Sequence, residues 1–296
     1  MSLRRRSGRW PAGRSLGRVR FAKGHGTEND FVLLLDADAG LDLTPERVRA
    51  LCERRGGLGA DGVLRVVRAA AAGEPERDGV EWFMDYRNSD GSTAEMCGNG
   101  ARVFARYLAE CGLVDGGELL LGTRGGVRRV RFTDDGLISV DMGPATVGAR
   151  STATVDGRAF DGVEVDLGNP HLACVTDVAL DTLDLGVPPG HDPAVFPHGV
   201  NVEFVTTVLD GEVSMRVHER GVGETRSCGT GTVAAVVAAL RHDGREVGSC
   251  GVLTPGGRLH VSVTAESTTL TGPAVIVAQG ELDRPWWDAA GEAASG

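Results

Sequence analysis

The apolar residues of this chain fall mostly into short runs that end at turns containing glycine or proline. Residues 19–36 predict two strands joined by a glycine-rich segment at 24–28. Aspartate–glycine pairs between alternating segments indicate two hairpins. Their strands are expected at 127–133 with 137–142, and at 201–208 with 212–218. The pattern is therefore typical of a strand-rich protein.

The sequence contains fewer signals for helices than for strands. Thr44 is a suitable cap and Pro45 a suitable first-turn residue for a helix that ends at the glycines 56–57. Two further helices are expected at 101–110 and 232–241, and the second is apolar all round, which predicts burial on all sides. A β-rich tail with a turn at 255–257 should end near Trp287, and the small polar residues after it should be frayed. Many strands with few helices predict an α+β fold.

A repeated motif organises the chain into halves. Cys97-Gly98-Asn99-Gly100 and Cys228-Gly229-Thr230-Gly231 each lead into a helical segment, 131 residues apart. Internal similarity at this spacing predicts two pseudo-symmetric domains, each a curved mixed sheet or barrel around a central helix, with the active site in the cleft between them. We expect a disordered leader at 1–18, an N-terminal domain at 19–140 completed by about 273–288, and a C-terminal domain at 141–272.

Charge and cysteine content narrow the function. The first 20 residues hold seven arginines and no acid, while the rest of the chain carries a net charge of −17. This acidic body argues against nucleic acid as a partner. No apolar run is long enough to span a membrane, so no membrane partner is expected. Without an apolar signal stretch, and with six cysteines but no C-x-x-C pair, we expect reduced thiols in the cytoplasm and no metal site. The basic start could instead be a binding arm or a transit-like peptide.

The two motif cysteines suggest a specific chemistry. A helix N-terminus presents unpaired N–H groups and partial positive charge, which favours a bound carboxylate or a thiolate and should lower the cysteine pKa toward neutrality. Two such cysteines facing one another could remove a proton from one face of a carbon and return it to the other. They could also be a redox pair that forms a disulfide. Buried cysteine is otherwise inert, which is our interpretation of Cys52, Cys111, Cys174 and Cys250.

Two other features of the sequence are candidates for a functional role. Residues 57–62 match the dinucleotide-binding pattern G-x-G-x-x-G, but they follow a helix rather than a strand, so turn-forming or site-lining glycines are the better interpretation. Among the histidines, His171 stands out through its neighbours as a candidate general base.

Six segments together resemble the diaminopimelate epimerase family. They are GHGTENDFV (24–32), GLGADGVL (57–64), YRNSDGSTAEMCGNGARVFARYL (86–108), GNPHLACV (168–175), VNVEF (200–204) and HERGVGETRSCGTGT (218–232). The resemblance implies a cofactor-independent epimerase that interconverts LL- and meso-diaminopimelate, on the route to lysine and peptidoglycan. It also implies a homodimer, with this small molecule as substrate and no cofactor.

The resemblance assigns roles residue by residue. Cys97 and Cys228 match the two acid/base cysteines, and His171 and Glu219 match polar groups beside the reacting centre. The implied substrate-binding side chains are Asn29, Asn88, Asn169, Asn201, Glu219 and Arg220, and the implied carboxylate-binding backbone amides are those of Gly98, Asn99, Gly229 and Thr230.

These residue types suit the implied substrate. Arg220 can hold a carboxylate with two hydrogen bonds, Glu219 can pair with an ammonium, and asparagines can serve both groups. The chain departs from the family at Gly62, where many relatives carry a substrate-contacting glutamine, and at Arg226, whose charge we expect to lower the pKa of Cys228 further. The alternatives are a proline-type racemase or phenazine-type isomerase of the same fold, and a catalytically silent binding or regulatory protein.

Overall fold

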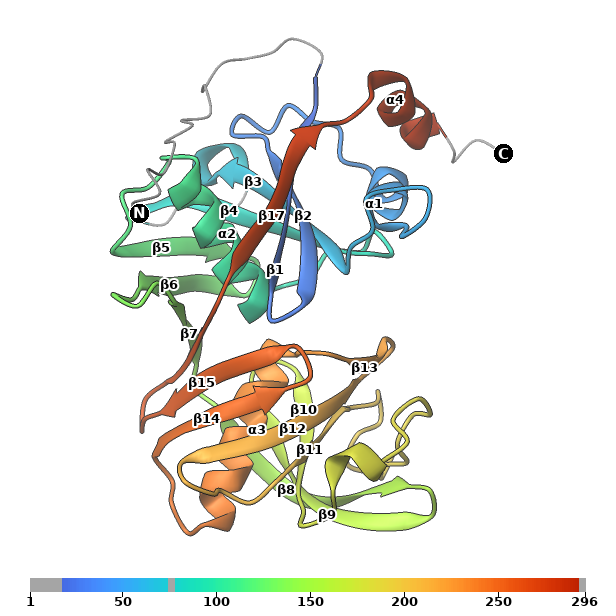
Figure 1. Ribbon diagram of the computed structural model, residues 1–296, viewed down its shortest axis with the longest axis vertical. Helices are drawn as coiled ribbons and strands as arrows, with labels where there is room; N and C mark the ends of the chain where they lie inside the picture. The colour runs from blue at the N-terminus through green and yellow to red at the C-terminus, as the bar shows by residue number, and fades with distance from the viewer. Residues whose placement is uncertain (1–17, 74–77, 293–296) are drawn as a thin grey trace, which may run out of the picture.

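The computed structural model describes residues 18–73 and 78–292, and it forms two lobes stacked along the long axis (Figure 1). We define the N-terminal lobe as the strands β1 to β7 and β17 with the helices α1, α2 and α4, and the C-terminal lobe as β8 to β16 with α3. The strands of the N-terminal lobe are β1 (Arg20–Gly26), β2 (Asn29–Leu35), β3 (Gly62–Arg68), β4 (Val80–Asn88), β5 (Glu118–Thr123), β6 (Gly126–Phe132), β7 (Ile138–Gly143) and β17 (Val275–Glu281). The strands of the C-terminal lobe are β8 (Thr146–Val155), β9 (Arg158–Asp166), β10 (Pro170–Val175), β11 (Asn201–Val205), β12 (Glu212–Glu219), β13 (Gly223–Thr225), β14 (Gly248–Thr254), β15 (Gly257–Val263) and β16 (Thr268–Gly272). The helices are α1 (Pro45–Cys52), α2 (Gly98–Glu110), α3 (Gly229–His242) and α4 (Arg284–Glu292), with short 3₁₀ turns at Ala69–Ala71 and Leu180–Thr182.

The strand pairing of one lobe repeats in the other. In the N-terminal lobe β1 pairs antiparallel with β2, β2 parallel with β3, β3 antiparallel with β4, and β4 parallel with β5 across α2. In the C-terminal lobe β9, β10, β11, β12 and β14 follow the same sequence of directions, with α3 in the place of α2. The antiparallel pair β7–β16 joins the two lobes. The fold is thus α+β with two pseudo-symmetric domains, as the repeated motif predicts.

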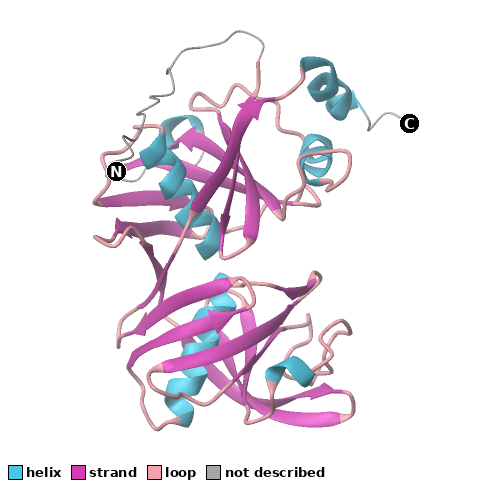
Figure 2. Ribbon diagram, in the orientation of Figure 1, coloured by secondary structure: helices cyan, strands magenta, loops and turns pink. Residues whose placement is uncertain are grey.

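Each lobe wraps its strands around one helix, as Figure 2 shows. Both helices lie in one continuous apolar core that includes residues of each lobe. All but three of the residues of α3 are buried, because Val, Ala and Leu occupy nearly every face of it. β17 returns from the C-terminal lobe and pairs antiparallel with β1. The central helices are therefore held rigidly on all sides, and only their N-terminal ends approach one another.

Most of the local predictions agree with the structure. The strands at the start, both hairpins and the turn at 255–257 are present, and Thr44 caps α1 by accepting from the N–H of Arg47 at 3.4 Å. Helix α1 ends at Cys52, before the expected glycines. The expectation of fraying after Trp287 is wrong up to residue 292, because α4 forms there and buries Trp287 against α1. Residues 1–17 of the leader expected at 1–18 lie outside the described residues, as do residues 74–77.

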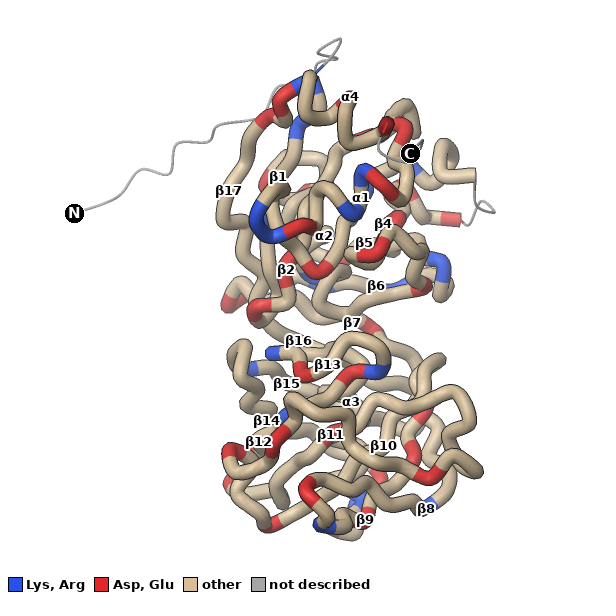
Figure 3. The backbone as a smooth tube through the Cα atoms, turned by 90° about the vertical axis from the view of Figure 1, so that its right-hand side faces the viewer, with Lys and Arg blue, Asp and Glu red and all other residues tan. Residues whose placement is uncertain are grey.

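Charged residues are spread over both lobes rather than gathered in one (Figure 3). In residues 18–73 and 78–292, no helix combines the length and the apolar character that crossing a membrane requires.

Candidate active site

Cys97 and Cys228 are the N-cap residues of α2 and α3, each with an extended backbone. The two helix starts lie against one another: a Cβ placed on Gly229 would be 3.3 Å from the Cα of Gly98 and 3.4 Å from the backbone N of Asn99. Glycine is needed here because any larger residue would separate the helices. The structure thus brings together the two motifs that the sequence placed 131 residues apart.

Both thiols are reduced and make local polar contacts. The Cys97 Sγ accepts a hydrogen bond from the N–H of Gly100 at 3.4 Å and lies 3.7 Å from the Asn29 Oδ1. The Cys228 Sγ lies 3.6 Å from the hydroxyl of Thr230. Each sulfur therefore sits at the rim of its own helix N-terminus, as the sequence predicts.

The expected lowering of the thiol pKa is wrong for both cysteines. Burial raises the pKa of Cys97 to about 11, against the opposing effect of the N–H groups of Gly100 and Asn99. Burial, followed by the nearby carboxylates of Glu219 and Glu203, raises the pKa of Cys228 well above its usual value. For both thiols the loss of hydration of the charged form outweighs the favourable effect of the helix N-terminus.

The expected effect of Arg226 is also not seen. Its guanidinium pairs with the carboxylate of Glu28 and donates to the Pro255 carbonyl at 2.6 Å, and the side chain is largely exposed. Arg226 therefore links the two lobes at the surface.

Glu219 lies at the end of β12, where it meets Cys228. Burial raises the pKa of its carboxyl, while hydrogen bonds from Thr225 and from the Cys228 thiol lower it in part. The next residue, Arg220, is exposed: its guanidinium donates to the His198 carbonyl at 3.2 Å, and its backbone N–H donates to the Asn201 Oδ1 at 2.9 Å. A half-buried acid thus stands beside the Cys228 thiol, and an exposed guanidinium follows it in the chain.

Of the four predicted asparagines, Asn29 and Asn169 form hydrogen bonds with residues of the cysteine motifs, and Asn201 bonds to the segment 168–175. Asn169 Nδ2 donates to the Thr230 hydroxyl at 3.4 Å, and Asn201 Nδ2 donates to the Pro170 carbonyl at 3.1 Å. Asn29 receives a hydrogen bond from Asn99 Nδ2 at 3.2 Å. Asn88 donates to the Ser92 hydroxyl at 3.0 Å within its own turn, and among the described residues no hydrogen bond joins its side chain to either cysteine motif.

Gly62 pairs with Asn88 across β3 and β4. A Cβ on Gly62 would lie 2.6 Å from the Arg87 carbonyl oxygen and 2.7 Å from the Tyr86 ring, so this backbone has no room for a glutamine. The neighbouring carboxylate of Asp61 accepts from Asn29 Nδ2 at 2.7 Å instead. Asp61, rather than residue 62, is the polar group that faces Asn29.

His171 makes a pair that the sequence analysis missed. Its Nδ1 lies 2.7 Å from the Glu203 Oε1, and both side chains are fully buried. Glu203 stands in the quoted segment VNVEF, and an acid inside a buried strand was the available signal. Arg102, Thr27 and Ser227 were missed as well. All three are buried polar residues that connect the two helix starts.

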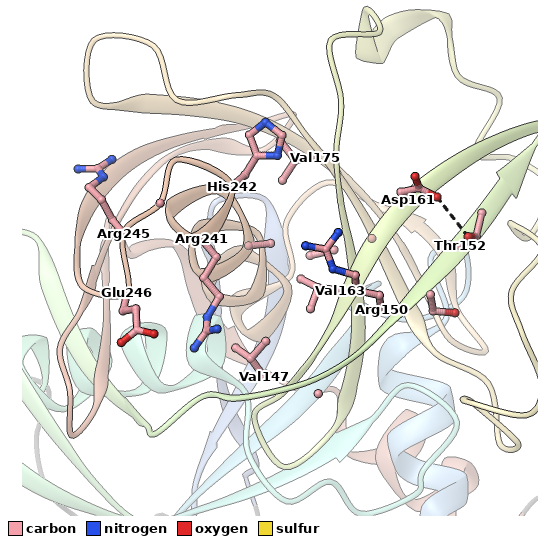
Figure 4. A pocket seen from close by; sticks show the side chains of 16 residues that line it. Val147, Arg150, Thr152, Asp161, Val163, Val175, Arg241, His242, Arg245 and Glu246 are labelled. Atoms are coloured by element: carbon pink, nitrogen blue, oxygen red, sulfur yellow. Dashed lines mark hydrogen bonds between the residues drawn. The ribbon is translucent and has the colours of Figure 1, made fainter.

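A separate hollow of about 960 Å³ lies at the other end of α3 (Figure 4). It forms where α3 stops at His242 while β8 and β9 continue, and Arg150, Arg241 and Asp161 stand around it. Cys228 caps the opposite end of the same helix, roughly 20 Å away at 1.5 Å per residue. The hollow is therefore distinct from the cysteine site.

The comparisons with known proteins agree with this geometry. The family model described as diaminopimelate epimerase matches residues 21–148 and 163–280. The diaminopimelate epimerase of Mycolicibacterium smegmatis is 57% identical over 286 residues, which is 91% of this chain and 98% of the relative. That of Rhodococcus erythropolis is 56% identical over 90% of this chain and 97% of the relative.

Solved structures share the fold at low sequence identity. A phenazine biosynthesis protein of the PhzF family from Bacillus anthracis superposes with a TM-score of 0.66 at 15% identity, over 90% of this chain and 99% of that one. A hydroxyproline epimerase from Agrobacterium vitis gives a TM-score of 0.62 at 15% identity, over 95% of this chain and 100% of that one. These likenesses establish the two-domain architecture alone, whereas the family match and the close relatives are specific. The chain belongs to the diaminopimelate epimerase family and is an isomerase of the amino-acid epimerase class.

Proposed function

We propose that this protein interconverts LL- and meso-diaminopimelate by proton transfer at the α-carbon, with Cys97 and Cys228 as the two acid/base groups. The observation that carries the proposal is the meeting of two equivalent helix starts, each capped by a cysteine, at Gly98 and Gly229. One thiolate removes the proton from one face of the carbon, and the opposite thiol returns a proton to the other face.

The helix starts supply the electrostatic part of the reaction. The first N–H groups of an α-helix have no partner within the helix, so those of Gly98, Asn99, Gly229 and Thr230 can hold the α-carboxylate. Negative charge that develops on the α-carbon and its carboxylate is then stabilised by fixed dipoles in a site without bulk water. This is the stabilisation that a reaction without pyridoxal phosphate or a metal requires.

The raised thiol pKa values fit this chemistry. An α-proton is very weakly acidic, and a buried thiolate with a high pKa is a stronger base toward it than an exposed one. The ammonium group of a bound amino acid adds positive charge beside the sulfurs, which favours the thiolate form. Burial of Cys97 and Cys228 therefore suits the proposed reaction, because the base is generated when substrate enters.

We assign the selection of the substrate to Glu219, Arg220 and the asparagines of the C-terminal lobe. Arg220 is exposed and holds only a backbone carbonyl with its guanidinium, so it can turn to a distal carboxylate. Asn169 and Asn201 can serve the distal ammonium and carboxylate, and Glu219 can pair with an ammonium. A mono-amino acid has no distal groups to satisfy these contacts, which disfavours a proline-type racemase.

We further propose that the reaction belongs to lysine and peptidoglycan precursor synthesis in the cytoplasm, and that the protein acts as a homodimer. Support for the dimer comes from β17, which pairs with β1 on one side and with no other described strand on the other. Val275 and Val277 on this strand are 43% and 56% exposed. An open strand edge with exposed apolar residues is suited to pairing with a second copy.

Deuterium exchange tests the proposed function. Purified protein, kept reduced, is incubated in D₂O with LL-diaminopimelate, and with L-proline as a mono-amino-acid control. We expect deuterium at the α-carbon of diaminopimelate, together with formation of the meso isomer, and none in proline. Absence of exchange in diaminopimelate would overturn the proposal, and exchange in proline alone would point to a racemase of the same fold.

A further inference from the structure

Arg102 is a buried cation that has no acidic partner in the described part of the chain. Its side chain is fully buried in α2, and no carboxylate among the described residues pairs with it. Its partners are neutral: Asn99 Oδ1 at 3.0 Å, the Thr27 hydroxyl at 3.3 Å and the Pro273 carbonyl at 3.3 Å. The Nη1 atom has no partner in the described part of the chain. A buried charge with only neutral partners is costly, so this arginine is suited to stabilising negative charge near it.

The position on the helix increases that cost. Arg102 lies in the second turn of α2, and its side chain reaches back to Asn99 in the first turn, close to the positive end of the helix dipole. A cation there is disfavoured by the helix itself. An anion bound at the same helix start would reverse the sign of this interaction.

Arg102 also fixes the orientation of Asn99. Because Asn99 Oδ1 accepts from the guanidinium, its Nδ2 must point the other way, toward the Ser227 carbonyl at 3.1 Å and the Asn29 Oδ1 at 3.2 Å. Ser227 belongs to the C-terminal lobe and directly precedes Cys228. A second route runs from Arg102 through the Thr27 hydroxyl to the Ser227 hydroxyl. Both hydrogen-bond routes begin at Arg102 and end next to the second cysteine.

The charges around the two cysteines differ. Glu219, Arg102 and Tyr86 interact with Cys97, and of these only Arg102 is cationic. Glu219 and Glu203, the latter paired with His171, interact with Cys228. Burial lowers the pKa of Arg102 to about 10, so the guanidinium stays protonated at neutral pH. Fixed positive charge therefore lies on the Cys97 side of the site.

We propose that Arg102 is a positioning residue of the two-cysteine site: its guanidinium fixes the Asn99 carboxamide that joins α2 to Ser227, and its charge stabilises negative charge at Cys97. The inference rests on the proposed function, because it assigns Arg102 to the same pair of cysteines. Arg102 is placed so that it touches neither reacting atom, yet it sets both the spacing of the two helix starts and the ionisation of the Cys97 thiol.

The test measures thiol ionisation without substrate. Reduced protein is treated with iodoacetamide over a range of pH, and alkylation of the Cys97 and Cys228 peptides is followed by mass spectrometry. In Arg102→Met we expect the pH at which alkylation of Cys97 is half-maximal to rise by about one pH unit or more, with a smaller change for Cys228. Arg102→Lys keeps the charge and should keep the midpoint. The control Arg106→Met removes an arginine one turn further along α2 that also donates to the backbone near Pro273, at the Ala274 carbonyl, and it should leave the midpoint unchanged.

Epimerisation kinetics test the positioning role. We expect kcat to fall about 100-fold in Arg102→Met and about tenfold in Arg102→Lys, which lacks the planar fork, with smaller changes in KM. A wild-type Cys97 midpoint in Arg102→Met, or a loss of kcat no larger than in Arg106→Met, would overturn the inference. Should Arg102→Met not fold, as judged by thermal unfolding, a wild-type kcat in Arg102→Lys would overturn the positioning role. Failure of the proposed function would give a different result. The wild-type protein would then show no deuterium exchange, although the pH midpoint of Cys97 alkylation would still change when Arg102 is replaced.

Discussion

The hydroxyls of Thr27 and Ser227 lie 2.8 Å apart, although one belongs to the N-terminal lobe and the other directly precedes Cys228 in the C-terminal lobe. Thr27 adopts a left-handed backbone, with φ of 51°, in the turn between β1 and β2. Both side chains are buried. This contact fixes how closely the two helix starts can approach.

The turn between β14 and β15 packs against the backbone of Thr27. A Cβ on Gly256 would lie 2.0 Å from the Thr27 carbonyl oxygen, so Gly256→Ala must displace either the Thr27 backbone or the turn that carries residue 256. We expect a loss of about 1–3 kcal/mol in unfolding free energy, measured in urea, and a fall in kcat. The matched control is Gly40→Ala, where the nearest atom to the new Cβ is 3.8 Å away. Equal stability of the two variants would contradict the close approach.

Each motif cysteine should be indispensable. Cys97→Ser and Cys228→Ser replace a thiol by a hydroxyl that ionises far less readily, and we expect epimerisation to fall about 10²–10⁴-fold in each. Cys111→Ser changes a half-buried cysteine at the far end of α2 and should keep near-wild-type activity. Measurement of meso-diaminopimelate formation checks this, and equal rates in all three variants would refute the assignment.

Glu219 should make stability depend on pH. Burial raises its pKa in the folded state above the usual 4.5, so the folded protein binds this proton more tightly than the unfolded chain. The unfolding free energy of the wild type should therefore fall, relative to Glu219→Gln, as pH rises from 4.5 through the folded pKa. Urea denaturation of both proteins over this range measures the difference. A difference that is constant with pH would contradict the raised pKa.

The buried pair His171–Glu203 should matter for stability. Glu203→Leu leaves the Nδ1 of His171 without its partner, and we expect a loss of about 1–3 kcal/mol in unfolding free energy. Glu224→Leu is the control, because it breaks a partly exposed ion pair with Arg216, and such pairs contribute about 0–1 kcal/mol. Denaturant titration of the two variants distinguishes these cases. A larger loss in the control would show that the buried pair is dispensable.

The exposed face of β17 should determine association. Val277→Asp places a charge on the open strand edge, and we expect the proposed dimer to dissociate to monomers in sedimentation velocity. Val187→Asp changes an equally exposed valine, at 64%, in the C-terminal lobe and should not alter the sedimentation coefficient. A dimer that persists in Val277→Asp would place the interface elsewhere.

The local elements and the chemistry of the motifs could be predicted from the order of the residues. Aspartate–glycine turns set the hairpins, and the repeated cysteine motif predicted both helix caps and the division into two like halves, because turn geometry and helix capping depend on residues close in the chain. It also supplied the residues that resemble one epimerase family.

The surroundings of those residues depend on the folded structure and could not be predicted from the sequence. The thiol pKa values rise because long-range packing removes water from Cys97 and Cys228, which reverses the expectation drawn from the helix N-terminus alone. Glu203 and Arg102 acquire roles from strands and turns far away in sequence. The fit at Gly62 likewise depends on Tyr86 across the sheet. Burial and charge are sums over the whole fold, and no local pattern contains them.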